Sequence, residues 1–259
     1  MRERLSFFVK RDSPIHRLNP MTKVVLALSL VLIAFSSPWF WTPPAIFILV
    51  ILPLTLIGKV AREYWNFFFK VILPTILFLF IMQALFLPGK SKIIFEIFGL
   101  EATELSAQLA FRNATRIAVM VSSFTILLLT THPSELMSDL TRRGMPGQFA
   151  YVIISSIQII PQMQAKAQTI ISAQRSRGLD TQSSFFKRAG SLIPLIGPLV
   201  FGSLVEVEER AIAIEARGFT STNTKTSLHE IPDTNVDKTI RWILVAFVLA
   251  SVAWRLWLL

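Results

Sequence analysis

The sequence predicts an all-α integral membrane protein with about five transmembrane helices and a cytoplasmic module of long helices. Hydrophobic residues make up 53% of the 259 residues and charged residues only 16%, whereas soluble domains average about 45–50% and about 25%. The mean hydropathy is +0.56. Charge-free runs long enough to cross a bilayer recur along the chain. These observations exclude an ordinary soluble enzyme and make the lipid bilayer the first expected partner.

The charge-free runs place the spans. Residues 24–57 carry no charge, which is enough for two short spans, and prolines and serines in 36–44 break the run in its middle. The aromatic cluster Trp39-Phe40-Trp41 suits a turn at the membrane interface. The predicted spans are about 23–39, about 43–60, 71–87, a helix from about 101–104 to 131, and 240 to about 259.

Lysine and arginine collect on one side of the predicted membrane. Six of the 26 lie in residues 1–23 and twelve in 132–241, whereas the loop 88–104 has only Lys90 and Lys92. The positive-inside rule therefore places the N-terminus and the long later stretch in the cytoplasm. The net charge of +10 then reflects topology, and no nucleic-acid partner is expected. The predicted parts are a basic N-terminal segment 1–23, four transmembrane helices in 24–131, a cytoplasmic helical module 132–239 and a last transmembrane helix 240–259.

The cytoplasmic stretch has helix starts and stops of its own. Proline near a helix start and glycine just after its end are typical signals. The predicted helices run from Pro133 to about Gly144, from Gln148 across Pro161 to Arg177, and from just after Pro194 or Pro198 to Arg217. The apolar stretch 192–205 is shorter than a span needs, so it is interpreted as buried or interfacial, with a sixth span left open.

The ends of the second and third of these helices resemble each other. Ala173-Gln-Arg-Ser-Arg177-Gly178 is echoed forty residues later by Ala213-Ile-Glu-Ala-Arg217-Gly218. One reading is plain helix capping, with glycine at the end and arginine favoured by the helix dipole. The other is docking, because an arginine fork can bind carbonyl or carboxylate groups of a partner at two points. The repeat favours docking, and the predicted docking residues are Arg175, Ser176, Arg177, Gly178, Ala216, Arg217 and Gly218.

No constellation for chemistry stands out. The chain has no cysteine, and its three histidines lie far apart without spaced partners. We therefore expect no catalytic residue, no metal site and no cofactor. Arg112 and Arg116 lie four residues apart on one face of a predicted span. They indicate either a substrate or proton path or, more often, arginines that reach the interface or brace a neighbouring helix.

An ordered set of motifs resembles one family over nearly the whole length. The chain is similar to the transmembrane coupling, or T, component of energy-coupling factor transporters, the EcfT/CbiQ-like family. Its motif before the first span departs from the family's Asp-Pro-Arg-Thr-Lys at Asn19 and Met21. The segments that carry the resemblance are Leu18-Asn-Pro-Met-Thr-Lys23, Thr130-Thr-His-Pro-Ser-Glu-Leu136, Arg143-Gly-Met-Pro146, Ile160-Pro161, Gln174-Arg-Ser-Arg-Gly178 and Glu215-Ala-Arg-Gly218.

The resemblance implies a non-catalytic subunit of an ATP-driven importer in the cell inner (cytoplasmic) membrane. In that family two helix tips dock on two ABC-type ATPases, and a small membrane subunit, the S component, captures a vitamin or a transition-metal ion. Carried over, Arg177 and Arg217 are the docking arginines. Ser176 and Ala216 keep the approach close, and Gly178 and Gly218 end the helices. The substrate is set by another chain.

Two other functions stay open at this point. The permease of a conventional ABC transporter also docks ATPases, but it is expected to carry one coupling motif per chain, and this chain has two. A membrane-embedded enzyme acting on lipid needs an acid, base or metal cluster at the interface, and the sequence presents none.

Overall fold

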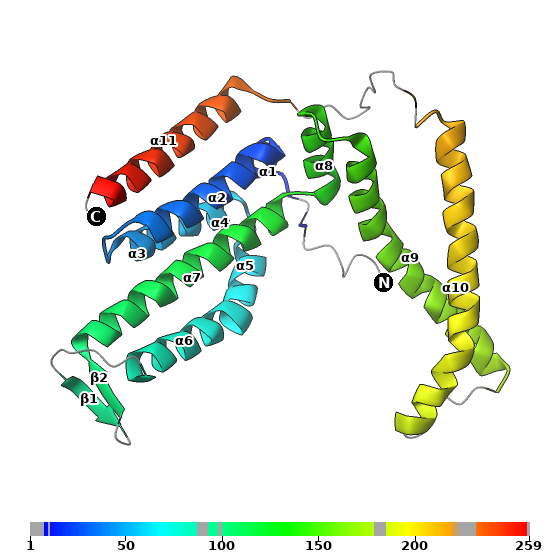
Figure 1. Cartoon of the computed structure of the whole chain (residues 1–259), viewed down its shortest axis with the longest axis horizontal. Helices are drawn as coiled ribbons and strands as arrows, with labels where there is room; N and C mark the ends of the chain where they lie inside the picture. Colours follow the sequence, from blue (N-terminus) through cyan, green and yellow to red (C-terminus); the bar gives the residue numbers. More distant parts are fainter. Residues whose placement is uncertain are drawn as a thin grey trace. The chain divides into compact units, whose positions relative to one another are not determined.

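A computed structural model of the chain divides into two compact units, residues 1–143 with 231–259 and residues 144–230. We name them the membrane unit and the helix-pair unit. The structure describes residues 8–9, 11–86, 93–97, 100–178, 185–219, 221 and 232–257. Nearly all of this is helix, as Figure 1 shows, so the predicted all-α class is confirmed.

The membrane unit is built mainly of helical segments, two of them π-helical. The π-helical segments η1 and η2 join their neighbours into two continuous helices, 42–57 and 61–86. The segments are α1 (Pro14–Arg17), α2 (Pro20–Ser36), α3 (Thr42–Ile46), η1 (Phe47–Ile51), α4 (Leu52–Ile57), α5 (Ala61–Phe67), η2 (Phe68–Ile72), α6 (Leu73–Phe86), α7 (Glu104–Thr130), α8 (Pro133–Arg142) and α11 (Asn235–Trp257).

Five apolar helices coincide with the five predicted spans. Among the described helices, three are long and apolar enough to cross a membrane, and two further apolar helices are shorter. The third helix begins at Ala61, about ten residues before the predicted start of its span. The prediction used only the charge-free run, whereas α5, the first part of this helix, includes charged side chains. The three long helices are Ala61–Phe86, Glu104–Thr130 and Asn235–Trp257, and the shorter ones are Pro20–Ser36 and Thr42–Ile57.

Helix α7 forms the centre of the membrane unit. It packs against α2, α3 and α6, while α11 packs against α2 (Figure 1). A stripe of small buried residues at every fourth position lets neighbouring backbones approach closely. Tyr64 donates a hydrogen bond of 2.7 Å from its hydroxyl to one member of the stripe, Ser122. The stripe consists of Ser106, Ala110, Ala114, Ala118 and Ser122.

Arg116 braces the end of α2. Its Nε donates to the carbonyl of Ala34 at 3.0 Å, and its Nη2 donates to the carbonyls of Phe35 and Ser37 at 3.2 and 3.0 Å. These carbonyls have no partner inside the helix, because the helix ends there. Of the two readings of this arginine, the structure therefore supports bracing.

A small hairpin replaces part of the predicted loop 88–104. Strands β1 (Ile93–Ile97) and β2 (Leu100–Thr103) pair antiparallel, with Ile97 opposite Leu100 and an irregularity between Ile93 and Phe95. Isoleucine and phenylalanine favour strands. The hairpin leads directly into α7, which Thr103 caps by accepting a hydrogen bond from the amide of Ser106 at 3.3 Å.

The helix-pair unit consists of α9 (Gly147–Ser176) and α10 (Phe185–Ala216), which run antiparallel and cross (Figure 1). Lys166 forms an ion pair of 2.7 Å with Glu206. Four residues away on each helix, Arg210 donates to Gln162 at 3.2 Å. The predicted end of α9 is confirmed, and α9 continues through Pro161.

The start of α10 was predicted wrongly. The helix begins at Phe185, and it includes both Pro194 and Pro198, after which it was expected to begin. Each proline removes only one backbone hydrogen bond, so helical turns on both sides can hold the helix together. The apolar stretch 192–205 therefore lies inside α10, which is not among the described helices apolar enough to cross a membrane.

His16 should make the stability of the membrane unit sensitive to pH. Its Nε2 lies 3.0 Å from the carbonyl of Val9, so Nε2 carries the proton and Nδ1 accepts from the hydroxyl of Ser13 at 2.8 Å. Burial lowers the pKa of His16 below its ordinary value of 6.5, against the hydrogen bond to Val9, which raises it. A group with a lowered pKa stabilises the fold above its unfolded pKa and loses this contribution as the pH falls.

We expect the melting temperature of the detergent-solubilised protein to fall between about pH 7.5 and about pH 5.5. In His16→Gln, which cannot titrate, this fall should be smaller. An equal fall in the two proteins would contradict the assignment.

Candidate functional site

The end of α9 has the conformation that a glycine permits. Arg177 is the last residue with near-helical angles, at φ −89° and ψ 7°, and Gly178 follows with φ 90°. The amide of Gly178 donates to the carbonyl of Arg175 at 3.0 Å. The side chains of Ser176 and Arg177 are exposed. Arg177 is therefore an exposed residue at a helix end whose backbone conformation is well defined.

The end of α10 is built in the same way. Gly218 has φ 69°, its amide donates to Glu215 at 2.9 Å, and the amide of Phe219 donates to Ile214 at 3.2 Å. These two bonds define a Schellman motif, which satisfies carbonyls that the helix leaves open. The Phe219 ring packs on Tyr151 of α9, with centroids 5.3 Å apart. Ala216 and Arg217 are exposed, so α10 also presents an arginine at a fixed tip.

A third Arg-Gly pair, at the end of α8, has an arginine that forms ion pairs within the chain. Arg143 ends α8 at φ −87° and ψ 5°, and Gly144 follows at φ 110°. Unlike the two tips, Arg143 turns inward and binds Asp139 at 2.8 Å and Asp233 at 3.2 Å. Within the described part of the chain, Arg177 and Arg217 form no ion pair. The two tip arginines therefore differ from Arg143 in that neither is used in an ion pair of the described structure.

The two tips lie at opposite ends of the helix pair. Lys166 lies opposite Glu206 and Gln162 opposite Arg210, so the residue opposite Arg217 is near position 155. Arg177 lies 22 residues further along α9, which corresponds to about 30 Å at about 1.5 Å per residue. The predicted docking residues therefore form two separate groups, one at the end of α9 and one at the end of α10. Figure 1 shows these two helix ends at opposite ends of the pair.

A largely buried polar cluster, which was not predicted from the sequence, joins three parts of the membrane unit. Asn19 is fully buried at the start of α2. Its side-chain amide donates to Asp139 of α8 at 3.3 Å, and its backbone amide donates to Asp237 of α11 at 3.0 Å. The partners of Asn19 are distant in the chain, so the sequence did not indicate these contacts. Only the family motif that contains Asn19 drew attention to this position. We name this set the junction cluster: Asn19, Asp139, Arg143, Asp233, Asp237 and Arg241.

Two arginines complete the junction cluster around Asp233. Arg241 binds this carboxylate at 2.8 Å, and Arg143 binds it at 3.2 Å. Burial opposes the ionisation of Asp233, but the hydrogen bonds and charges of the two arginines outweigh it and lower its pKa. The hydrogen bond to Asp139, against burial, raises the pKa of Arg143. The surroundings of Asp233 and Arg143 therefore favour the charged form of each, and the contacts of the cluster hold α2, α8 and α11 together.

The tip geometry predicts different effects for two glycines of α10. Gly218 has a positive φ that other residues adopt at a cost of about 1–2 kcal/mol. Gly197 is helical, and an added Cβ would meet nothing within 4 Å. Gly218→Ala should therefore speed amide hydrogen exchange at residues 214–219. Gly197→Ala should slow exchange in α10, since alanine favours a helix by about 0.5–1 kcal/mol. Equal protection in the two variants would refute this reading of the tip.

Within the described ranges, no group of three or more histidine, aspartate and glutamate side chains is placed to hold a metal ion. The features that stand out are two exposed arginines at the ends of α9 and α10 and, in the membrane unit, the junction cluster.

The chain is similar to known proteins over most of its length. The profile of the CbiQ family, described as "Cobalt transport protein", matches residues 11–228. The energy-coupling factor transporter transmembrane protein of Leuconostoc gelidum subsp. gasicomitatum is 31% identical, over 97% of this chain and 96% of its own. The proteins of the same name from Limosilactobacillus fermentum and Bacillus subtilis are each 29% identical, over 95% of this chain and 96% and 94% of theirs.

Proposed function

We propose a coupling role on the premise that this chain belongs to the CbiQ family and is a transmembrane component of an energy-coupling factor transporter. In this role it transmits conformational change from two cytoplasmic ABC-type ATPases to a small substrate-capture membrane subunit. The chain itself catalyses no reaction. The complex lies in the cell inner membrane with the N-terminus in the cytoplasm. It imports a vitamin or a transition-metal ion that the capture subunit selects.

The separated arginine tips are the observation that carries the proposal. One rigid helix end with an exposed arginine suits one socket, and two ends about 30 Å apart suit two copies of an ATPase rather than one. An arginine fork can bind carboxylates or backbone carbonyls in such a socket. Arg143, with the same backbone geometry, is already paired inside the chain, so it is not a third docking arginine.

The helix-pair unit also leaves a large apolar surface for the capture subunit. Exposed apolar side chains follow one another at helical spacing on both helices. Contiguous exposed apolar surface marks protein or membrane interaction sites. On α9 they are Phe149, Val152, Ile153, Ile157 and Ile160, and on α10 they are Ile196, Val200, Leu204 and Val207.

The proposed mechanism depends on the rigidity of the helices α9 and α10. ATP binding closes the ATPase pair, and the docked tips move with their sockets. Because α9 and α10 cross and are linked by Lys166–Glu206, a displacement at the tips turns the two helices against each other. The apolar faces of the pair then press on the capture subunit. The junction cluster keeps α8 fixed on the membrane helices, and the chain leaves it through Gly144.

A pull-down from native membranes tests the proposal. The tagged chain is solubilised in mild detergent, and its co-purifying proteins are identified and counted by mass spectrometry. We expect two ATPase subunits per tagged chain and one small, very hydrophobic membrane protein. Recovery of a folded chain with neither would overturn the coupling role. Recovery of ATPases without any capture subunit, in a complex that transports by itself, would favour a conventional permease.

A further inference from the structure

Three arginines gather at the C-terminal end of α2. Arg116 and Arg255 both donate to the carbonyl of Phe35, at 3.2 and 3.1 Å, so two positive groups meet at one oxygen. Arg112 lies one turn before Arg116 on the same face of α7. Its neighbour Phe111 packs on Phe40 of the turn after α2, with ring centroids 5.2 Å apart. The Nε of Arg112 is buried and has no hydrogen-bond partner in the described structure.

These charges are not compensated by the described residues. No ion pair there includes Arg112, Arg116 or Arg255. Carbonyl oxygens share a positive charge but do not neutralise it, and charged groups at membrane depth normally find a counter-charge. The positive-inside rule does not explain them, since they lie at the opposite end of α2 from Lys23 and the basic N-terminal segment. Three positive groups therefore lie near one another with no carboxylate partner among the described residues.

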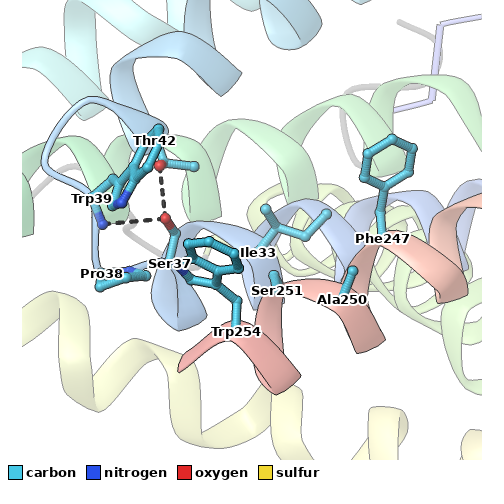
Figure 2. A pocket seen from close by; sticks show the side chains of 9 residues that line it. All are labelled: Ile33, Ser37, Pro38, Trp39, Thr42, Phe247, Ala250, Ser251 and Trp254. Atoms are coloured by element: carbon cyan, nitrogen blue, oxygen red, sulfur yellow. Dashed lines mark hydrogen bonds between the residues drawn. The ribbon is translucent and has the colours of Figure 1, made fainter. Parts of the chain in front are cut away.

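An apolar groove begins beside the same helix end. It has a volume of about 390 Å³, within the range of ordinary ligand pockets. Arg116 binds the carbonyl of one lining residue, Ser37, and Arg255 directly follows another, Trp254. Figure 2 shows the lining side chains, which come from α2, the turn after it, the start of α3 and α11. They are Ile33, Ser37, Pro38, Trp39, Thr42, Phe247, Ala250, Ser251 and Trp254.

The groove offers an occupant almost no polar contact. The hydroxyls of Ser37 and Thr42 bond to each other at 2.7 Å (Figure 2), and the hydroxyl of Ser251 donates to its own helix at 2.8 Å. The remaining lining is aliphatic and aromatic. Trp39 and Trp254 are at least half exposed, as expected for rings at the level of lipid headgroups. The groove therefore fits a hydrocarbon chain.

We propose that the groove and the three arginines form one site for an anionic phospholipid. An acyl chain lies in the groove between α2 and α11, and the phosphate lies against Arg255 and Arg112. Both halves of the site point to this occupant, because only an amphiphile carries an apolar chain and a negative headgroup together. Arginine suits phosphate because its planar fork can donate two parallel hydrogen bonds.

Native mass spectrometry of the intact complex tests the site. The complex is released from nanodiscs that contain phosphatidylglycerol and phosphatidylcholine in equal amounts, and retained lipids are counted. The wild type should retain one phosphatidylglycerol in preference to phosphatidylcholine. Arg255→Gln should reduce this preference roughly fivefold. Ala250→Phe, which fills the groove without changing charge, should abolish retention. Arg62→Gln, which removes an exposed arginine elsewhere, should behave like the wild type.

The other outcomes each overturn the proposal. Equal retention of the two lipids by the wild type identifies an ordinary annular contact. Unchanged retention in Ala250→Phe places the lipid elsewhere. Loss of a protein subunit in Ala250→Phe, with no change in lipid, makes the groove a protein interface. If Arg255→Gln does not fold, Arg112→Gln tests the headgroup contact on the same readout.

Discussion

Replacing Arg177 and Arg217 together by glutamate is expected to abolish assembly of the chain with the ATPases. Each change places a negative charge in a socket that binds a guanidinium. Losing one partner of a buried charged contact at an interface costs about 2–5 kcal/mol. Affinity should therefore fall at least about thirtyfold for each tip. The amount of ATPase that co-purifies with the tagged variant measures this directly.

Three controls separate docking from folding. Glu208→Arg changes the charge of the exposed surface of α10 by two units, as each tip substitution does but in the opposite direction. It should leave assembly intact, because Glu208 lies away from the tips. The melting temperature of the double variant should match the wild type, because neither arginine has an ion-pair partner in the described structure. Arg→Lys at both tips keeps the charge but loses the fork, and it should give intermediate affinity. Wild-type assembly of the double Glu variant would refute the docking assignment.

Asp139→Ala is expected to be the most destabilising single substitution in the junction cluster. The carboxylate of Asp139 has no exposed surface, and it binds Arg143 at 2.8 Å and Arg142 at 3.4 Å. Breaking a buried ion pair costs about 3–5 kcal/mol. Water reaches a third of the Arg143 side chain, so we expect about 3 kcal/mol. Thermal unfolding of the purified protein in detergent measures the change.

The matched control is an ion pair on the surface. Asp12 pairs with Arg17 at 2.9 Å, but both side chains are at least three-quarters exposed. Exposed pairs contribute little to stability, so Asp12→Ala should leave the melting temperature unchanged within error. Asp139→Asn, which keeps the shape of the side chain, should lie between the two. If Asp139→Ala and Asp12→Ala behave alike, the junction cluster is not a stabilising element.

The helices could be predicted because each depends on residues near one another in the chain. The break expected in 36–44 is the gap between α2, which ends at Ser36, and α3, which begins at Thr42. The end of α9 was predicted from Arg177 and Gly178, whose backbone angles are those of a helix end. A charge-free run and a glycine that follows an arginine are both local features of the sequence. One sequence is therefore enough to predict the helices and helix ends that they mark.

The junction cluster could not be predicted, since the contacts that tie its parts together join residues 90, 120 and 218 positions apart. Asn19 drew notice only as a departure from a family motif, and nothing in the sequence indicated which acids it meets. The start of α10 was missed for another reason. Proline weighs heavily as a helix breaker in sequence reasoning, yet α10 includes Pro194 and Pro198.

The junction cluster also sets an order of events during biosynthesis. Asn19 and Asp237 are separated by 218 positions, and chains enter the membrane from the N-terminus onward. Until α11 has been synthesised and inserted, the amide of Asn19 lacks Asp237, and Arg143 has only part of its counter-charge. The membrane unit therefore cannot close until nearly the whole chain exists. A chain that stops before α11 leaves the polar groups of its junction without these partners.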